Sequence, residues 1–198
     1  MKPALIVFVR NPVIGQVKTR IARTLGEETA LSVYQKLLHH TRSITQNLPA
    51  EIYIFYADGI NGEDLWNGEP YTKQEQYGTD LGERMENAFN HLFNKGYERV
   101  AIIGSDCFDL TQELLEEALD CLLQYNLVVG PSEDGGYYLL GMNTFFPNLF
   151  VNKQWSTASV LMDTLKDIEQ TNLSLYTLPL LSDVDTADDC NRYVELLT

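Results

Sequence analysis

The sequence predicts a single α/β domain with a mainly parallel sheet that carries helices on both faces. Apolar runs of strand length alternate with segments whose apolar residues recur at helical spacing, and this alternation continues through the first two-thirds of the chain. The first run, residues 4–9, is continuously apolar, as is typical of a central strand covered on both faces. A hairpin signal later in the chain makes the predicted sheet mixed.

The other elements follow from the same two periodicities. Strands are expected at residues 51–57, 99–104, 127–130, 137–141 and 173–178, with a hairpin turn at 133–136. Helices are expected over residues 33–48, 85–93, 114–123 and 160–168. Pro49 and Gly96 end the first two helices, and a capping box at residues 186–189 opens a C-terminal one. Residues 10–20 and 58–68 are expected to be loops.

Length and composition favour one domain. The chain has 198 residues, of which 44% are hydrophobic and 21% charged, enough for one well-filled core and rather short for two. The sequence contains no repeat, low-complexity tract or convincing linker. We therefore expect residues 1–198 to form a single domain, and no apolar run is long enough to span a membrane.

Charge is distributed unevenly along the chain. The formal net charge of -14 argues against a general nucleic-acid binder, because phosphate backbones are held by clustered Lys and Arg. No acidic residue precedes Glu27, whereas that stretch contains Lys2, Arg10, Lys18, Arg20 and Arg23. A cationic first segment in an acidic protein indicates a local site for an anion.

A targeting peptide is the alternative explanation of this first segment. Its apolar run is too short for a secretory core and ends at Arg10-Asn11-Pro12, so a buried strand fits better. The cysteines, Cys107, Cys121 and Cys190, form no CxxC pair and suit a reducing compartment. We therefore expect a cytoplasmic protein.

Three segments fall at the carboxyl ends of predicted strands, where open α/β sheets bind ligands. In the first, residues 10–20, Gly15 permits close backbone approach, and Lys18 and Arg20 offer charge to phosphate oxygens. The segment lacks the GxxxxGK[ST] pattern of a P-loop. A solvated basic loop is the alternative, but its position and charge favour phosphate binding.

The second segment is Gly104-Ser105-Asp106-Cys107-Phe108-Asp109. Asp106 ends an apolar strand and is well placed to hold Mg²⁺ or Mn²⁺, because such ions need only one or two protein carboxylates when substrate phosphates complete the shell. We expect Asp109 to cap the following helix instead. Cys107 has no histidine near it in sequence, so a Cys-His mechanism is not supported.

The third segment, residues 133–138, combines two carboxylates, two glycines and two tyrosines. It is either a plain hairpin turn or part of a pocket for the acceptor of a transferred group. Asp183 and Asp185 add an acidic pair before the last helix. This pair either caps that helix or completes the metal shell.

Assembled in this order, the segments resemble the DUF2064 family of small bacterial glycosyltransferase-like proteins, also called selenodomain-associated transferase 1. That family is related to the GT-A nucleotide-diphospho-sugar transferases and to the molybdopterin-guanylyl and phospholactate-guanylyl transferases. The resemblance covers nearly the whole chain. Its landmarks are residues 15–20 (GQVKTR), 78–85 (GTDLGERM), 104–107 (GSDC), 130–138 (GPSEDGGYY), 155–156 (WS) and 183–186 (DVDT).

The resemblance implies a three-layer α/β/α sandwich of GT-A type with a mainly parallel mixed sheet. By similarity, Asp106 takes the place of the metal-holding acid, and Asp134 lies near the acceptor. Because only one acid stands at that turn, Asp185 or Asp134 has to be its partner at the metal. The residues expected at the nucleotide are Arg10, Gly15, Lys18, Arg20, Asp80 and Arg84. This sequence departs from the wider pattern because it has no DxD motif around Asp106, and because Phe108 stands where the family commonly has proline.

Three functions are compatible with these residues. The first is a glycosyltransferase with a nucleotide-sugar donor, a divalent metal on Asp106, a small-molecule acceptor, and Asp134 and Asp106 as catalytic candidates. The second is a nucleotidyltransferase of guanylyltransferase type, which the absence of a GGxGTR-like run after the first strand disfavours. The third is a nucleotide-binding module without catalysis. The sequence does not indicate an oligomeric state.

Overall fold

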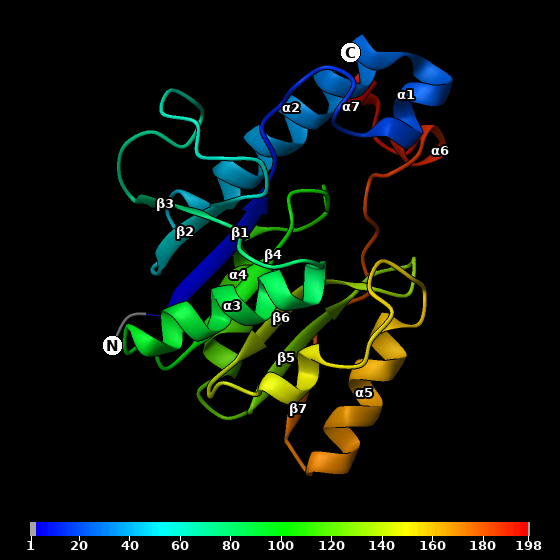
Figure 1. Ribbon diagram of the computed structural model, residues 1–198. Coiled ribbons are helices and arrows are strands. Elements are labelled where there is room, and N and C mark those ends of the chain that lie inside the picture. Colours follow the sequence, from blue (N-terminus) through cyan, green and yellow to red (C-terminus); the bar gives the residue numbers. More distant parts are fainter. Residues whose placement is uncertain (1–2, 198) are drawn as a thin grey trace.

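The computed structural model describes residues 3–197 and confirms the predicted mixed α/β sheet (Figure 1). Within those residues one seven-stranded sheet has the strand order β3-β2-β1-β4-β6-β5-β7. Strand β6 runs antiparallel to its neighbours β4 and β5, while the other neighbouring strands are parallel.

Helices alternate with the strands along the chain. The strands are β1 (Ala4–Val9), β2 (Glu51–Tyr56), β3 (Tyr71–Glu75), β4 (Val100–Ile103), β5 (Leu127–Pro131), β6 (Tyr137–Met142) and β7 (Leu175–Thr177). The helices are α1 (Thr19–Leu25), α2 (Glu27–Thr45), α3 (Leu81–Asn94), α4 (Gln112–Cys121), α5 (Val160–Thr171), α6 (Ala187–Cys190) and α7 (Val194–Leu197), with a 3₁₀ turn η1 (Pro147–Phe150).

Two layers of helices enclose the sheet (Figure 1). Leu5 and Val7 of β1 belong to the core under α2 and α4. Ala4 and Ile6 belong to the opposite core, under α3 and α5. Because successive side chains of a strand point to opposite faces, the continuous apolar run of β1 supplies both cores.

A third apolar cluster joins the two ends of the chain. Ile21 of α1 and Val33 of α2 pack with Val184 and Cys190, and all four are fully buried. The cluster brings the C-terminal segment against the helix that follows the first strand. It thereby places residues 183–185 beside the carboxyl edge of the sheet.

Two elements escaped prediction because their apolar patterns are sparse. Helix α1 begins at Thr19, inside the segment expected to be a loop, and Ile21 is its only buried residue. Strand β3 is an edge strand with the polar sequence YTKQE and no fully buried residue. The last strand, β7, is shorter than expected. Leu123, expected on the buried face of α4, lies beyond that helix and is 68% exposed.

The helix caps correct one prediction and confirm another. Asp109 does not cap α4, because Thr111 is the N-cap and accepts a hydrogen bond from Leu114 N–H. Asp109 instead accepts one from the Tyr193 hydroxyl. The capping box at Thr186 and Asp189 is present. The acidic pair before α6 therefore does not supply the cap.

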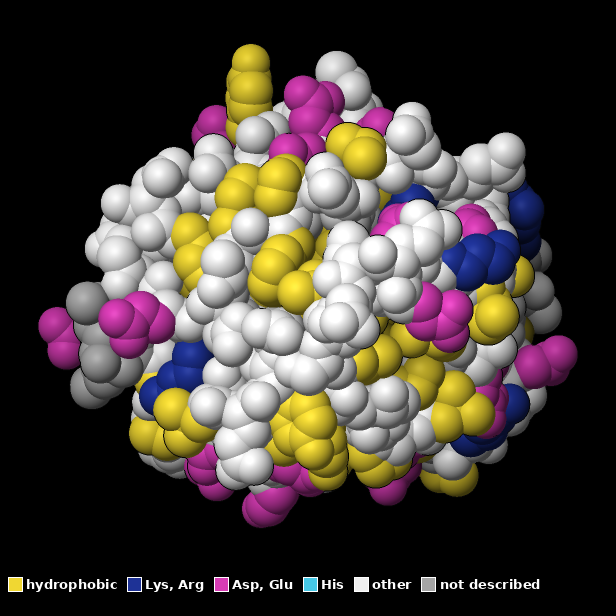
Figure 2. Space-filling view, turned by 90° about the horizontal axis from the view of Figure 1, so that it is seen from below, with side chains coloured by type: hydrophobic (Ala, Val, Ile, Leu, Met, Phe, Trp, Pro, Cys, Tyr) yellow, Lys and Arg dark blue, Asp and Glu magenta, His cyan; other side chains and the backbone are white. Residues whose placement is uncertain are grey.

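The helices and one face of the molecule bear on a membrane or nucleic-acid partner. Among residues 3–197, no helix has both the length and the apolar character needed to cross a membrane. On the face shown in Figure 2, Lys and Arg side chains are few and stand apart, with Asp, Glu and apolar side chains between them. A nucleic acid is held by clustered cations.

His40 of α2 makes a testable contribution to stability. Its Nε2 lies 2.9 Å from the carbonyl oxygen of Leu110, and its ring centroid is 4.8 Å from that of Phe108. Burial lowers the pKa of His40 below its ordinary value of 6.5. Since the unfolded chain then binds the proton more readily, stability is lost as the pH falls below about 6.5.

His40→Gln should therefore flatten the fall of the unfolding free energy between roughly pH 7 and pH 5, measured by urea titration. His39→Gln is the matched control, because His39 is the exposed neighbour on the same helix. Equal flattening in both variants would contradict the assignment to His40.

Candidate functional site

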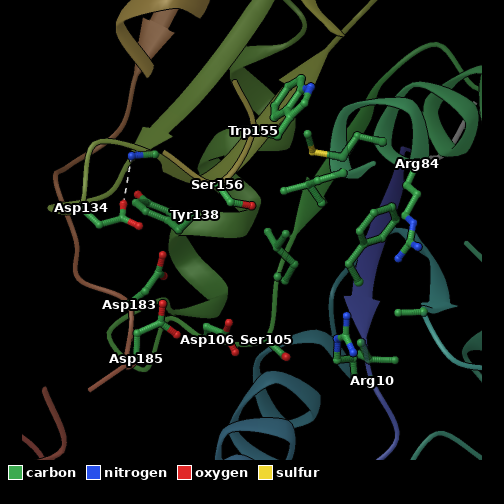
Figure 3. A pocket seen from close by; sticks show the side chains of 18 of the residues that line it. Arg10, Arg84, Ser105, Asp106, Asp134, Tyr138, Trp155, Ser156, Asp183 and Asp185 are labelled. Atoms are coloured by element: carbon green, nitrogen blue, oxygen red, sulfur yellow. Dashed lines mark hydrogen bonds between the residues drawn. The ribbon is translucent and has the colours of Figure 1, made fainter. Parts of the chain in front are cut away.

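A cleft of about 1060 Å³ lies at the carboxyl edge of the sheet (Figure 3). Strands β1 and β4 are neighbours there, but β1 leads to β2 on its other side, so this is a topological switch point. Open α/β sheets bind their ligands at such points. The cleft is lined by the loop after β1, the start of α3, the turn after β4, the β5–β6 hairpin, residues 155–160, and Asp183 and Asp185.

Asp106 and Asp185 reach the cleft from segments far apart in the chain. Asp106 follows β4, and its carbonyl oxygen accepts a hydrogen bond of 2.8 Å from Val184 N–H. Val184 is fully buried in an extended segment, so Asp183 and Asp185 on either side of it turn toward the cleft. The side chains of Asp106 and Asp185 are each 41% exposed.

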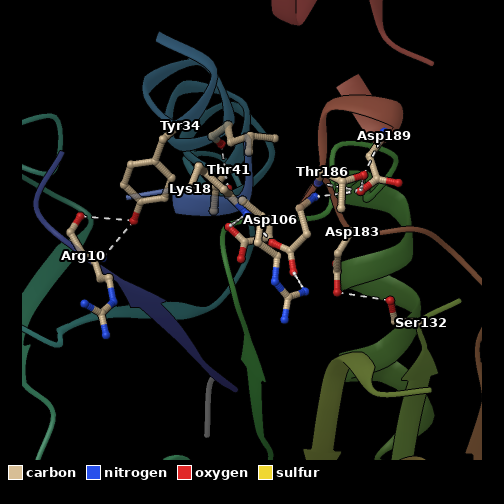
Figure 4. Close-up of polar contacts among 12 residues, drawn as sticks. Arg10, Lys18, Tyr34, Thr41, Asp106, Ser132, Asp183, Thr186 and Asp189 are labelled. Atoms are coloured by element: carbon tan, nitrogen blue, oxygen red, sulfur yellow. Dashed lines mark hydrogen bonds and ion pairs between the residues drawn. The ribbon is translucent and has the colours of Figure 1, made fainter. Parts of the chain in front are cut away.

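Lys18 lies between these two carboxylates (Figure 4). Its Nζ is 2.9 Å from Asp106 Oδ1 and 2.9 Å from Asp185 Oδ1, and only 5% of its side chain is exposed. Burial by itself would lower the pKa of Lys18, but the two carboxylates outweigh that effect and hold the pKa above its usual value. The ammonium is therefore a permanent cation between two acids.

The backbone directs Lys18 into this position. Its φ is 46°, a left-handed conformation that is uncommon for a residue with a Cβ atom. The Lys18 carbonyl oxygen begins helix α1 by accepting a hydrogen bond of 2.9 Å from Ala22 N–H. Arg20, two residues later, is more exposed, and its Nη1 is 3.7 Å from Asp185 Oδ2.

Asp183 is a largely buried acid next to this group. Ser132 Oγ donates a hydrogen bond of 3.1 Å to Asp183 Oδ2. Burial, followed by the negative charge of Asp106, raises the pKa of Asp183 to about 7.

Arg10 and Arg84 face each other across the other half of the cleft (Figure 3). The backbone of Arg10 is held by Tyr34 of α2, whose hydroxyl accepts from Arg10 N–H at 2.9 Å and donates to Arg10 carbonyl oxygen at 3.1 Å. Arg84 Nε donates to the Gly78 carbonyl oxygen at 3.1 Å. Neither guanidinium forms an ion pair within residues 3–197, so both can bind an anion.

The start of α3 also shapes the cleft. Asp80 is the N-cap of this helix and accepts a hydrogen bond of 2.9 Å from Glu83 N–H. A Cβ atom added at Gly82 would lie 2.0 Å from Trp155 Nε1, so the indole packs directly on the helix backbone. Glycine at position 82 therefore fixes Trp155 at the rim of the cleft.

The hairpin and residues 155–160 form one continuous wall. Asp134 Oδ1 accepts a hydrogen bond of 2.9 Å from Gly136 N–H, which orients the carboxylate. The Gly135 carbonyl oxygen accepts one of 3.0 Å from Leu161 N–H. Gly135 has a φ of 88°, and a Cβ atom there would lie 2.3 Å from the Ala158 carbonyl oxygen, so glycine is required for this close approach.

The cleft gathers most of the residues that the sequence suggests for the site. Gly15 is the exception, since it lies near the Glu27 carboxylate and does not line the cleft. Tyr34 and Trp155 line the cleft without having been assigned a role. Asp183, expected with Asp185 either to cap the last helix or to complete the metal shell, lines the cleft as well. The expected residues that do line it are Arg10, Lys18, Arg20, Asp80, Arg84, Asp106, Asp134 and Asp185.

A Cys-His mechanism and a metal site built from three or more protein ligands both find no support in this cleft. Burial raises the pKa of the Cys107 thiol to about 12, so it is a poor nucleophile at neutral pH. None of the described residues that line the cleft is a histidine. Within residues 3–197 there is also no group of three or more His, Cys, Asp or Glu side chains arranged to hold a metal ion.

Comparison with known proteins assigns the chain to a family. The family described as "Uncharacterized protein conserved in bacteria (DUF2064)" matches residues 40–157, more than half of the chain. This chain belongs to that family. The match confirms the predicted resemblance, although it includes neither the Lys18 loop nor residues 183–186.

Three similar proteins show how far the likeness extends. A crystal structure of a "putative nucleotide-diphospho-sugar transferase" from Desulfovibrio desulfuricans G20 has a TM-score of 0.89 and 35% identity, covering 96% of this chain and 84% of that one. A 2-phospho-L-lactate guanylyltransferase from Methanocaldococcus vulcanius is 26% identical over 192 residues, 93% of this chain and 82% of the relative. A Mycobacterium tuberculosis H37Rv protein in complex with manganese shares the fold, with a TM-score of 0.54 and 13% identity over 98% of this chain and 99% of that one.

The packing of Trp155 on α3 can be tested with Gly82→Ala. The added methyl group overlaps the indole, so we expect a loss of about 1–3 kcal/mol in unfolding free energy and a shift in tryptophan emission. Gly62→Ala is the control, because nothing lies within 4 Å of a Cβ atom there. If urea denaturation and emission spectra are the same for the two variants, Trp155 does not pack against Gly82.

Proposed function

We propose that this protein is a glycosyltransferase that takes a sugar from a nucleotide-sugar donor in the cleft at the carboxyl edge of the sheet. The observation that carries the proposal is the position of Lys18, Asp106 and Asp185 together at the topological switch point. A cation beside carboxylates at this edge suits the phosphates of a nucleotide and a metal that screens them. The 35% identity to the D. desulfuricans protein supports the transferase class.

The cations of the cleft are suited to the diphosphate of the donor. Arg10 and Arg84 have no carboxylate partner in the described chain, and Lys18 and Arg20 lie beside Asp185. Guanidinium groups bind phosphate oxygens through paired hydrogen bonds. When the sugar is transferred, negative charge builds up on the departing diphosphate, and these fixed cations stabilise it.

A divalent metal fits the donor set of Asp106 and Asp185. Both are partly exposed carboxylates, and Mg²⁺ or Mn²⁺ needs no further protein ligand when phosphate oxygens and water complete the shell. Bound there, the metal would supply additional neutralisation of the diphosphate charge. A protein of the same fold has been solved in complex with manganese, which is consistent with this proposal.

Lys18 competes with a metal for the same oxygens. Its Nζ contacts Oδ1 of both carboxylates, so the ammonium is the counter-ion of the free protein. A nucleotide diphosphate offers that ammonium other acceptors and frees the carboxylate oxygens. Metal is therefore expected to bind weakly alone and more tightly together with the nucleotide.

Asp134 is the proposed base or acceptor-positioning residue. The Gly136 N–H holds its Oδ1, while Oδ2 accepts no hydrogen bond from the residues that the structure describes. An oriented carboxylate with one free oxygen can accept a proton from an attacking hydroxyl group. Asp134 lines the cleft on the wall opposite Arg10 and Arg84 (Figure 3).

Nucleotidyl transfer is the second candidate, and the guanylyltransferase relative favours it. The two reactions differ in their products, since sugar transfer releases a nucleoside diphosphate and nucleotidyl transfer releases pyrophosphate. We would incubate the protein and Mn²⁺ with nucleotide-sugars or nucleoside triphosphates plus candidate acceptors, and separate the products by chromatography. Pyrophosphate together with a nucleotidylated acceptor, and no nucleoside diphosphate, would replace the first proposal by the second. Nucleotide binding without any product would favour a non-catalytic module.

We also propose a cytoplasmic location for this protein. Cys107, Cys121 and Cys190 are all free thiols, and two of them are buried. Free thiols are usual where the surroundings are reducing, whereas disulfides form in oxidising compartments.

The metal proposal predicts the behaviour of Asp106→Asn. The substitution removes one carboxylate charge at nearly constant shape, so Mn²⁺-dependent binding of UDP or GDP should weaken by at least about 10-fold in titration calorimetry. Asp109→Asn is the matched control, because Asp109 lies on the same turn but bonds to Tyr193 outside the cleft. Unchanged affinity in Asp106→Asn, with an unchanged circular dichroism spectrum, would remove the metal role.

The competition between Lys18 and a metal for the carboxylate oxygens predicts that Lys18→Met has opposite effects on the binding of Mn²⁺ and of GDP. Mn²⁺ alone should bind the variant at least about 10-fold more tightly, because two carboxylates lose their internal counter-ion. GDP measured without metal should bind more weakly, whereas guanosine should be little affected, because only GDP carries the diphosphate. Paramagnetic resonance of free Mn²⁺ and calorimetry measure the two effects. Weaker Mn²⁺ binding in Lys18→Met would refute the competition.

A further inference from the structure

The cations that line the cleft come from one set of segments, and the β5–β6 hairpin and residues 155–160 contribute none of them. We call one part of the cleft lining the donor side; it comes from the loop after β1, the start of α1 and α3, and its cations are Arg10, Lys18, Arg20 and Arg84. We call the other part the acceptor side; it comes from the hairpin, residues 155–160 and the C-terminal segment, and it includes Asp134, Tyr137, Trp155 and Asp183. In the described chain, no Lys or Arg lines the cleft from these acceptor-side segments. Figure 3 shows the two sides facing each other.

The cations nearest in sequence to the acceptor side are already neutralised. Arg192 Nη1 is 2.8 Å from Glu133 Oε2 and also donates to Ser182 Oγ at 3.1 Å. Lys153 forms an ion pair with Asp167, away from the cleft. Neither side chain is free to bind an anion beside Asp134.

The acceptor side combines its carboxylates with aromatic and apolar surface. Trp155 packs on Gly82 of α3, and Met85 of α3 and Val160 also line the cleft. The Tyr137 hydroxyl has only the Met85 sulfur, 4.0 Å away, as a partner in the described chain. A sulfur is a weak acceptor, so this phenol can still donate to a ligand oxygen.

From this division we infer that the acceptor is a neutral hydroxyl compound with an apolar face, such as a sugar or polyol, and not a phosphorylated or carboxylated one. Carboxylates accept hydrogen bonds from hydroxyl groups, and an indole covers the apolar face of a ring. An anionic group would instead lie near Asp134 and Asp183 without a free cation. The inference rests on the proposed function and specifies its second substrate.

Binding of metal and nucleotide does not reverse the preference for a neutral acceptor. A divalent cation on Asp106 and Asp185, together with Lys18, would offset the charges of those two carboxylates, whereas Asp134 forms no ion pair within residues 3–197. The nucleotide diphosphate brings further negative charge of its own. The acceptor side therefore keeps its preference for a neutral ligand when the donor is bound.

The transfer step needs only the donor, the acceptor and Asp134. The acceptor hydroxyl oxygen forms a bond to the anomeric carbon of the donor sugar, while the bond from that carbon to the diphosphate oxygen breaks. The diphosphate leaves with the electron pair of the broken bond, and the hydroxyl proton passes to Asp134. No further reactant is needed.

The two tryptophans of the chain allow a direct test. Trp66 is 2% exposed in the core, whereas Trp155 lines the cleft, so a change in tryptophan emission upon ligand addition reports on the acceptor side. The probes are methyl α-glucoside and glucose 6-phosphate, titrated with Mn²⁺ and GDP present. We expect the neutral probe to bind at least about tenfold more tightly, and Trp155→Phe to abolish the signal. Equal or tighter binding of the phosphorylated probe, or no response to the neutral one, would overturn the inference.

Reversal of the charge at Asp134 gives a second test of the inference. Asp134→Lys should narrow the preference for the neutral probe by about tenfold or more, while Asp188→Lys, a reversal on α6 outside the cleft, should leave it unchanged. If Asp134→Lys does not fold, the wild-type protein still decides, because added NaCl should strengthen binding of the phosphorylated probe by screening the repulsion. An unchanged preference in Asp134→Lys, together with no effect of NaCl on binding of the phosphorylated probe, would contradict the electrostatic argument.

The failure of this inference can be told apart from failure of the proposed function. Calorimetry of GDP with Mn²⁺ measures the donor site separately from the probe titrations. Tight GDP binding together with a preference for glucose 6-phosphate would reject the neutral acceptor and keep the transferase. Absence of binding by both GDP and UDP would reject the proposed function, whatever the probes show.

Discussion

A buried ammonium between two carboxylates links the parts of this molecule that form the cleft. Lys18 belongs to the loop after β1, Asp106 to the turn after β4 and Asp185 to the C-terminal segment. Because an unpaired charge removed from water is strongly destabilising, the three segments must come together as the chain folds. The hydrogen bond from Val184 N–H to Asp106 carbonyl oxygen and the apolar cluster around Ile21 hold the same arrangement.

The same group explains how a site rich in acids stays folded without a ligand. Lys18 pairs with both Asp106 and Asp185, Arg20 also lies beside Asp185, and the pKa of Asp183 is raised because burial disfavours its charged form. Binding of a nucleotide with a metal would exchange the partners of these groups without leaving a buried charge unpaired. Stability and ligand binding thus depend on one set of contacts.

The two walls of the cleft are built from different kinds of structure. The switch point between β1 and β4 is a property of the fold, so it recurs wherever the fold does. The opposite wall is built by the hairpin and residues 155–160, whose close contacts depend on Gly135 and Gly82. Loops on a shared scaffold determine the specificity of a site. A guanylyltransferase relative and a neutral acceptor here are therefore compatible.

The sequence by itself determined the α/β class and most strands and helices, because apolar periodicity is a local signal. It also indicated that the segments carrying Lys18, Asp106 and Asp134 lie together, because parallel strands end at one edge of the sheet. It missed α1 and β3, whose few apolar residues leave almost no periodic signal, and it assigned the wrong cap to α4. Only the tertiary structure decided that Lys18 lies between Asp106 and Asp185, that Asp183 is buried, and that Trp155 packs on Gly82. These facts depend on distances between residues far apart in the chain, and no local pattern records them.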